Sequence, residues 1–267
     1  MNISILGCGW LGLPLAKKLI EGGHTLNGST TSRDKMNSLG NEGIAPYKIQ
    51  LFEEGVQGDI SSFLENSEVL IIDIPPGLRK DPEVNFVAKI GRLKSYVEKS
   101  GIQKVLFVSA TSVFEDGKNL PTYTEEDVPN GTAENAKQLI EAEELLKASD
   151  NYKTSVLRFG GLIGPGRHPV NYLSGKTDLK DPEGPVNLIH LEDCIGIIEA
   201  IIEKDAWGET FHGVCPEHPT RKEYYSRVAK VKGLAGMSFN EDSVSKGKVI
   251  KSVNIDEILG YQFKNTI

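Results

Sequence analysis

Cysteine is scarce in this chain, with only Cys8, Cys194 and Cys215 among 267 residues. The three lie far apart, and neither a CxxC pair nor a Cys/His cluster occurs. A disulfide framework and a zinc site both need such groupings, so neither is indicated. We therefore expect the cysteines to be core residues, and we expect no metal site.

Long apolar runs and an excess of basic residues are also missing. No stretch reaches the roughly 18 uninterrupted apolar residues of a membrane-spanning helix. The 30 Lys and Arg residues are outnumbered by 37 Asp and Glu residues, for a net charge of -7. Binding to nucleic acid or to anionic membrane needs a basic surface, so we expect neither partner.

The N-terminus lacks the features of a signal peptide. Its apolar stretch has no leading positive region and is interrupted by Gly7, Gly9 and Gly12. We therefore expect a cytoplasmic protein.

Short apolar runs alternate with helical patterns along the first 160 residues. This order is typical of a parallel sheet with both faces covered, so we predict a Rossmann-type, doubly wound α/β fold. The expected strands are 2–6, 25–29, 47–51, 69–74, 104–109 and 154–159, and the clearest helices are 11–20, 84–99 and 133–148.

The texture changes after Phe159, where 160–184 has the composition of a loop rich in Gly and Pro. A helix at 191–204, a strand at 210–214 and a helix at 220–232 follow, the last with a capping box from Thr220 and Glu223. We predict a dinucleotide-binding domain over 1–160, to which 187–215 returns. The remaining segments, 161–186 and 216–267, would form a small C-terminal substrate-binding lobe.

A glycine-rich turn connects the first strand to the first helix. The segment from Gly7 to Gly12 reads G-x-G-x-x-G. In this motif Gly7 permits the tight turn, Gly9 lets the backbone approach a pyrophosphate, and Gly12 lets helix and strand pack closely. We predict a dinucleotide site to which Trp10 and Leu11 also contribute, with Trp10 either covering the cofactor or packing beneath it. A tight turn without a ligand is the alternative.

The end of the second strand indicates which cofactor is used. Thr30, Thr31 and Ser32 offer hydroxyls and Arg33 offers a guanidinium, whereas no carboxylate occurs before Asp34. NAD binders usually carry an acidic residue here for the ribose hydroxyls, so we expect NADP rather than NAD. The alternative is that Arg33 only faces solvent.

Two further strand ends belong to the predicted cofactor site. Ile74, Pro75 and Pro76 follow the fourth strand, at the edge where open α/β sheets bind ligands, and would form a rigid wall beside the adenosine. Ser109 ends the fifth strand and is the last of the predicted cofactor-binding residues.

Five segments carry a family resemblance that covers nearly the whole chain. They are Gly7–Gly12, Ser109–Phe114, Glu143–Leu146, Leu157–Gly166 and Asn187–Asp193. Together they resemble the extended short-chain dehydrogenase/reductases, in the NAD(P)-dependent nucleoside-diphosphate-sugar epimerase/dehydratase group. The resemblance implies a two-lobed cleft that takes a small-molecule substrate such as a nucleotide-sugar.

The family often dimerises through its helices, so the resemblance also raises a homodimer. An apolar stripe on the helix over 133–148 would suit that role or face the core, and the sequence leaves both interpretations open. The stripe consists of Leu139, Ile140, Ala142 and Leu146.

The resemblance departs from the family pattern at the catalytic residues. The family uses a Ser or Thr after the fifth strand and a Tyr-x-x-x-Lys on the next helix for proton transfer. Here the tyrosine position falls on Asn135, the lysine position on Leu139 and the serine position near Ala110, which leaves Thr111 or Ser112 as the nearest hydroxyl.

The remaining candidates for proton transfer are His168, Tyr123 and His190, and His168 follows a Gly-Pro-Gly-Arg loop. Our catalytic candidates combine Thr111 and Asn135, which lie near or at the family's catalytic positions, with His168. Two functions remain open: an NAD(P)-binding, epimerase/dehydratase-like oxidoreductase, or a catalytically silent NADP(H)-binding sensor or scaffold.

Overall fold

The apolar runs of the sequence become strands of one parallel sheet in the computed structural model, which describes residues 1–78 and 81–267. Its strand order is β12-β9-β7-β6-β1-β2-β3, and β1 lies between β2 and β6 and is parallel to both. This arrangement confirms the predicted Rossmann-type sheet. The strands are β1 (Asn2–Leu6), β2 (Thr25–Thr30), β3 (Ala45–Lys48), β6 (Val69–Ile72), β7 (Lys104–Ala110), β9 (Lys153–Phe159) and β12 (Thr210–Gly213).

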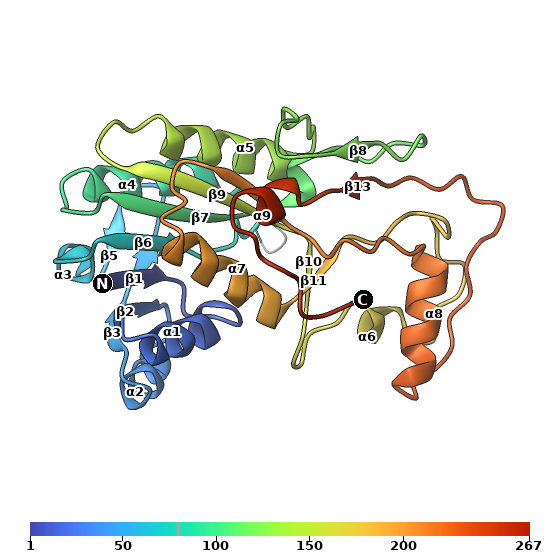
Figure 1. Ribbon diagram of the computed structural model, residues 1–267, viewed down its shortest axis with the longest axis horizontal. Coiled ribbons are helices and arrows are strands. Elements are labelled where there is room, and N and C mark those ends of the chain that lie inside the picture. Colours follow the sequence, from blue (N-terminus) through green and yellow to red (C-terminus); the bar gives the residue numbers. More distant parts are fainter. Residues whose placement is uncertain (79–80) are drawn as a thin grey trace. The chain divides into compact units, whose positions relative to one another are not determined.

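Helices cover both faces of this sheet, which explains why its central strands are continuously apolar. All of β6 and residues 3–6 of β1 are buried. In Figure 1, helices α4 and α5 lie on one face and helices α1 and α2 lie on the other. Their bounds are α1 (Gly12–Glu21), α2 (Arg33–Asn41), α4 (Phe86–Val97) and α5 (Glu134–Lys147).

One predicted strand is wrong in its bounds. The run 47–51 is split at Ile49, so that β3 joins the main sheet beside β2 while β4 (Gln50–Leu51) pairs antiparallel with β5 (Val56–Gln57). The resulting β4-β5 hairpin is followed by the short helix α3 (Ile60–Leu64), whose N-cap Asp59 accepts a hydrogen bond from the Ser62 amide. A continuous apolar run does not reveal this change of partner.

The apolar stripe of α5 is part of the core. Leu139, Ala142 and Leu146 are buried, and α5 packs along α4. Gln138 joins the two helices, since its side chain accepts from the Phe86 amide and donates to the Val84 carbonyl. The structure thus resolves the open alternative for these three residues in favour of the core.

The chain divides into two compact units. The first comprises residues 1–110, 132–158 and 198–210, and the second comprises 111–131, 159–197 and 211–267. Helix α7 (Leu191–Glu203) and β12 each contribute residues to both. Within the second unit, β8 (Thr122–Tyr123) pairs with β13 (Val249–Ile250), although the two strands lie far apart in the sequence.

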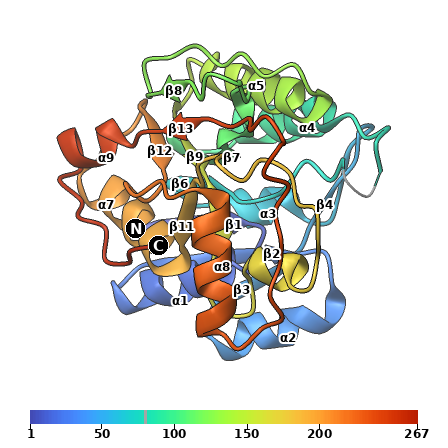
Figure 2. The ribbon, with the colours of Figure 1, turned by 90° about the vertical axis from the view of Figure 1, so that its right-hand side faces the viewer.

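The second unit is built around its own small core, with helix α8 (Arg221–Val231) facing the viewer in Figure 2. Thr220 and Glu223 form the predicted capping box at the start of α8. The segment 160–184, predicted as a loop, contains β10 (Gly161–Ile163) and α6 (Val170–Leu173). The other elements of the second unit are the 3-10 helix η1 (Thr111–Val113), β11 (Leu188–His190) and α9 (Val253–Glu257). The core residues are Ile163, Val170, Val186, Leu188, Tyr224, Tyr225 and Ala229.

Candidate functional site

A cavity of about 420 Å³ opens in the first unit at the carboxyl ends of β1, β2 and β6. The chain runs from β1 to β2 on one side and returns to β6 on the other, so β1 lies at the point where the strand order reverses. Open α/β sheets bind their ligands at such a point. The cavity is lined by Leu6–Gly9, Ser29–Thr31, Lys35, Ile49–Leu51, Asp73–Pro76, Phe86 and Lys89.

The three glycines of the turn differ in what a side chain would meet at each position. Gly7 has a φ of 109°, and a Cβ there would overlap the Asp73 carbonyl. A Cβ on Gly12 would overlap the Gly7 carbonyl, which shows how closely helix and strand approach. A Cβ on Gly9, by contrast, would meet no protein atom within 4 Å. The fold itself therefore requires Gly7 and Gly12, whereas Gly9 leaves open space at the cavity wall.

Hydrogen bonds to Ser29 hold the turn against the second strand. The Gly7 amide donates to Ser29 Oγ over 2.9 Å, and the Cys8 amide donates to the Ser29 carbonyl over 2.8 Å. Helix α1 starts immediately afterwards, and the amides of Leu11 and Gly12 have no acceptor within the helix. Free amides at the positive end of a helix dipole are groups that favour the approach of an anion.

Cys8 lines the cavity but is not a nucleophile. Burial, with a further contribution from the Asp73 carboxylate, raises the pKa of its thiol to about 12. The thiolate is the reactive form of cysteine, so this thiol stays inert near neutral pH.

The end of β2 differs in part from the prediction. Thr30 and Thr31 line the cavity, and Thr30 Oγ1 accepts from the Ser32 amide over 3.1 Å. Arg33 is an exposed residue at the start of α2 and does not belong to the lining. Lys35, also on α2, does line the cavity, and the sequence analysis did not predict it.

The remaining cofactor candidates lie in different surroundings. Ile74, Pro75 and Pro76 line the cavity, whereas Trp10 and the buried Leu11 do not. Ser109 donates to the Glu143 carboxylate over 2.6 Å, and Arg158 pairs with the same carboxylate. The hydroxyl proton of Ser109 is therefore already donated to a buried carboxylate in the interior of the first unit.

Lys89 is the second basic lining residue that the sequence analysis missed. It lies on α4, one turn after Phe86, which also lines the cavity. The spacing of three residues along a helix could have indicated a shared face.

The three catalytic candidates belong to different environments. Asn135 is exposed in the first turn of α5, in the first unit. Thr111 is buried in η1, in the second unit. His168 is also in the second unit and is only 7% exposed. Their catalytic roles remain predictions.

His168 has both ring nitrogens engaged. Nε2 shares a 3.0 Å hydrogen bond with the Tyr224 hydroxyl, and Nδ1 accepts from the Val170 amide over 3.1 Å. Burial, aided by Lys232, lowers its pKa to about 4. A neutral, hydrogen-bonded imidazole at the edge of a core favours a structural role.

The other two candidates have local partners in the second unit. The Tyr123 hydroxyl donates to the Glu115 carbonyl over 3.2 Å and accepts from Asn130. His190 is half-buried, and its Nδ1 accepts from the Glu192 amide over 3.4 Å.

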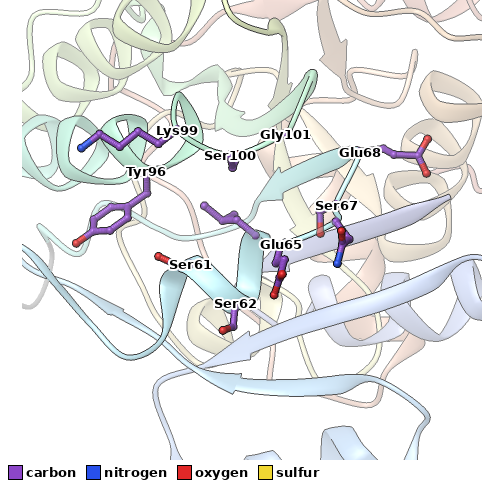
Figure 3. A pocket seen from close by; sticks show the side chains of 11 residues that line it. Ser61, Ser62, Glu65, Ser67, Glu68, Tyr96, Lys99, Ser100 and Gly101 are labelled. Carbon is purple, nitrogen blue, oxygen red and sulfur yellow. The ribbon is translucent and has the colours of Figure 1, made fainter.

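A larger cavity of about 740 Å³ lies at the opposite edge of the sheet (Figure 3). Its walls come from the segments that precede β6 and β7, and they present serine hydroxyls together with Glu65 and Glu68. This is the amino edge of the strands, where Ser61 and Ser62 come from the first turn of the short helix α3. The glycine-rich turn Gly7–Gly12 lies at the smaller cavity instead, through its lining residues Gly7, Cys8 and Gly9.

Two further properties concern residues 1–78 and 81–267 alone. Within these ranges no helix has both the length and the apolar character that a membrane crossing requires. The same residues contain no group of three or more His, Cys, Asp or Glu side chains placed to hold a metal ion.

Comparisons with known proteins agree with this architecture. No protein-family model matches the chain. It is 31% identical over 265 residues to protein YeeZ of Escherichia coli K12, covering 98% of this chain and 96% of YeeZ. A UDP-glucuronic acid 4-epimerase from Bacillus cereus, in complex with UDP-glucuronic acid and NAD, has a TM-score of 0.81 at 17% identity and covers 100% and 95% of the two chains.

A short-chain dehydrogenase/reductase superfamily protein from Agrobacterium tumefaciens with bound NAD has a TM-score of 0.78 at 16% identity, covering 100% of this chain and 93% of that one. At such identities the likeness concerns the fold. The identity to YeeZ along nearly the full length of both chains shows the family. The chain therefore belongs to the family of protein YeeZ and has the fold of the extended short-chain dehydrogenase/reductases.

Proposed function

We propose that this protein binds a nicotinamide dinucleotide in the cavity at the carboxyl edge of its sheet. The observation that carries the proposal is Gly9, which lines the cavity and whose missing side chain leaves space that no protein atom fills. At the turn between β1 and α1, this open space lets the phosphates of a ligand approach the backbone closely. The NAD complexes of the similar structures support the same class of cofactor.

The cavity and the adjacent start of α1 fit such a cofactor. The amides of Leu11 and Gly12, at the positive end of α1, would hold the pyrophosphate. Thr30 and Thr31 would offer hydroxyls to the adenosine ribose, and Pro75 and Pro76 would form a rigid wall beside it. The absence of a carboxylate at the end of β2 favours NADP over NAD.

The reaction we propose is hydride transfer of the epimerase/dehydratase type on a nucleotide-sugar or a similar small molecule. When bound, the nicotinamide would supply the hydride chemistry. The similar epimerase structure contains a nucleotide-sugar, which supports this substrate class. Proton transfer would rest on residues other than the usual Tyr and Lys, with His168 as the first candidate, whereas Thr111 and Asn135 would orient the substrate through hydrogen bonds.

A catalytically silent cofactor sensor or scaffold is the second candidate function. Its supporting observation is Leu139, which is 4% exposed in the core beneath α5 where the family has its lysine. An ammonium group would be costly at this buried position. Binding would remain while turnover is lost.

Titration of the purified protein with NADP and NAD tests the binding proposal. We expect a saturable change in tryptophan fluorescence, since Trp10 lies in the glycine turn, directly after the lining residue Gly9. Calorimetry under the same conditions should give one site per chain. If neither dinucleotide binds at millimolar concentration, the proposal is wrong.

A further inference from the structure

Two lysines give the cavity wall a positive charge, although the chain as a whole carries a net charge of -7. Lys35 comes from α2 and Lys89 from α4, and both line the cavity. Within the described ranges, neither belongs to a salt bridge. The described lining contains one acidic residue, Asp73. The wall therefore has two cations against one carboxylate, which suits a ligand with several negative charges.

Both lysines come from helices that lie near the end of β2, on one side of the cavity. Lys35 is in the first turn of the helix that follows β2. The Ile49 amide donates to the Thr30 carbonyl over 3.1 Å, which places the start of β4 beside that strand end. Helix α4, which carries Lys89, packs against β4. The glycine turn follows β1, so the lysines lie toward the adenosine end of a dinucleotide whose pyrophosphate is at the turn.

The β4-β5 hairpin is fastened to the helix that carries Lys89. The Asn85 amide, at the N-cap of α4, donates to the Glu53 carboxylate over 2.8 Å. Arg92 Nε donates to the Glu53 carbonyl, also over 2.8 Å. These bonds flank Lys89 on both sides along the helix. They hold its backbone in a fixed position relative to Gln50 and Leu51 of β4, which also line the cavity.

We propose that Lys35 and Lys89 together bind a phosphate on the adenosine ribose, so that the cavity selects NADP through two lysines. This inference rests on the proposed dinucleotide function and replaces the predicted Arg33 contact with two residues that line the cavity. Ammonium groups donate charge-assisted hydrogen bonds to phosphate oxygens, and two of them from different helices can engage one phosphate without a bidentate guanidinium.

The test measures affinities for NADP and NAD by calorimetry in single variants of the full chain. Lys35→Met and Lys89→Met each remove the charge and keep the aliphatic stem. We expect each to weaken NADP binding by about tenfold or more, while the affinity for NAD changes by less than about twofold. Lys89→Arg should retain most of the preference for NADP. Because the contacts are ionic, the preference should also shrink as salt is raised.

Two further variants complete the design. Lys99→Met removes an exposed lysine beyond the end of α4, at the other edge of the sheet, and should leave both affinities unchanged. Arg33→Ala tests the predicted contact directly and should keep the preference for NADP. Circular dichroism and a urea midpoint for each variant establish that it is folded.

The outcomes separate this inference from the proposed function. Unchanged NADP affinity in both lysine variants, or an equal loss for NADP and NAD, overturns the phosphate assignment while dinucleotide binding stands. Loss of the preference in Arg33→Ala alone also overturns it. A wild-type protein that binds neither dinucleotide contradicts the proposed function itself, and the inference with it.

Discussion

Glu143 and Arg158 form a buried ion pair, with side chains that are 3% and 4% exposed. Arg158 donates to both carboxylate oxygens, and Ser109 donates to one of them. Since removal of one partner leaves an uncompensated buried charge, we expect Arg158→Met to lower the free energy of unfolding by about 3 to 5 kcal/mol. Urea denaturation followed by circular dichroism measures this change. The double variant Glu143→Leu/Arg158→Met should recover much of it, and a double variant as unstable as the single one would contradict the charge explanation.

His168 makes stability depend on pH. Its pKa falls from the ordinary histidine value of 6.5 to about 4 in the folded protein, chiefly through burial. Between these values the unfolded chain binds a proton that the folded chain does not, so this contribution to stability is present above pH 6.5 and is lost as the pH falls toward 4. We expect wild-type protein to lose about 1 to 2 kcal/mol more than His168→Gln between about pH 7 and pH 5.

Urea midpoints of the two proteins at both pH values give this difference. His24 and His218 also have lowered pKa values through burial, but they contribute equally to wild type and variant. An identical pH dependence in the two proteins would remove His168 as its source.

At the scale of single elements, two helix N-termini form a matched pair. Thr220 caps α8 with a full capping box, whereas the side chain of Ser32, at the N-cap of α2, makes no capping hydrogen bond. We expect Thr220→Ala to cost about 1 kcal/mol of unfolding free energy and Ser32→Ala to cost much less. Thermal or urea denaturation compares the two directly. Equal effects would show that the cap bond does not stabilise α8.

The same two helices show what the sequence can predict. Helix α8 is predictable because its capping box is a local signal. Helix α2 lacks such a signal, because its N-cap Ser32 makes no side-chain capping bond, and of its residues only Leu39 is buried. The strand 47–51 is misplaced for a different reason: its apolar run is continuous, but its hydrogen-bond partner changes at Ile49. The apolar run by itself does not show which segment each of its residues pairs with.

The candidate site is predictable where a turn motif determines it. Gly7, Gly9, Thr30 and the segment from Ile74 to Pro76 follow strand ends and line the cavity. Lys89 cannot be found in this way, because α4 reaches the cavity only through its packing on β4.

At the scale of the whole molecule, the altered catalytic positions predict little turnover. Loss of a positioned acid or base lowers the rate by about 10² to 10⁴-fold. Asn135 and Leu139 occupy the positions at which the family has its catalytic tyrosine and lysine. We expect activity on common nucleotide-sugars to fall far below the usual enzyme median of about 10 s⁻¹. A coupled assay of nicotinamide absorbance with excess NADP measures it. Turnover near the median would mean that another residue transfers the proton, and His168→Ala would be the first variant to assay.

The central claim is that the space beside Gly9 holds the dinucleotide. Calorimetric titration of NADP into wild type, Gly9→Val and Gly101→Val tests it most directly. Neither glycine has protein atoms within 4 Å of a built Cβ, and Gly101 lies at the other edge of the sheet. Both variants should therefore fold. We expect Gly9→Val to lose NADP binding and Gly101→Val to retain wild-type affinity. A folded Gly9→Val protein that binds NADP as tightly as wild type would contradict the account.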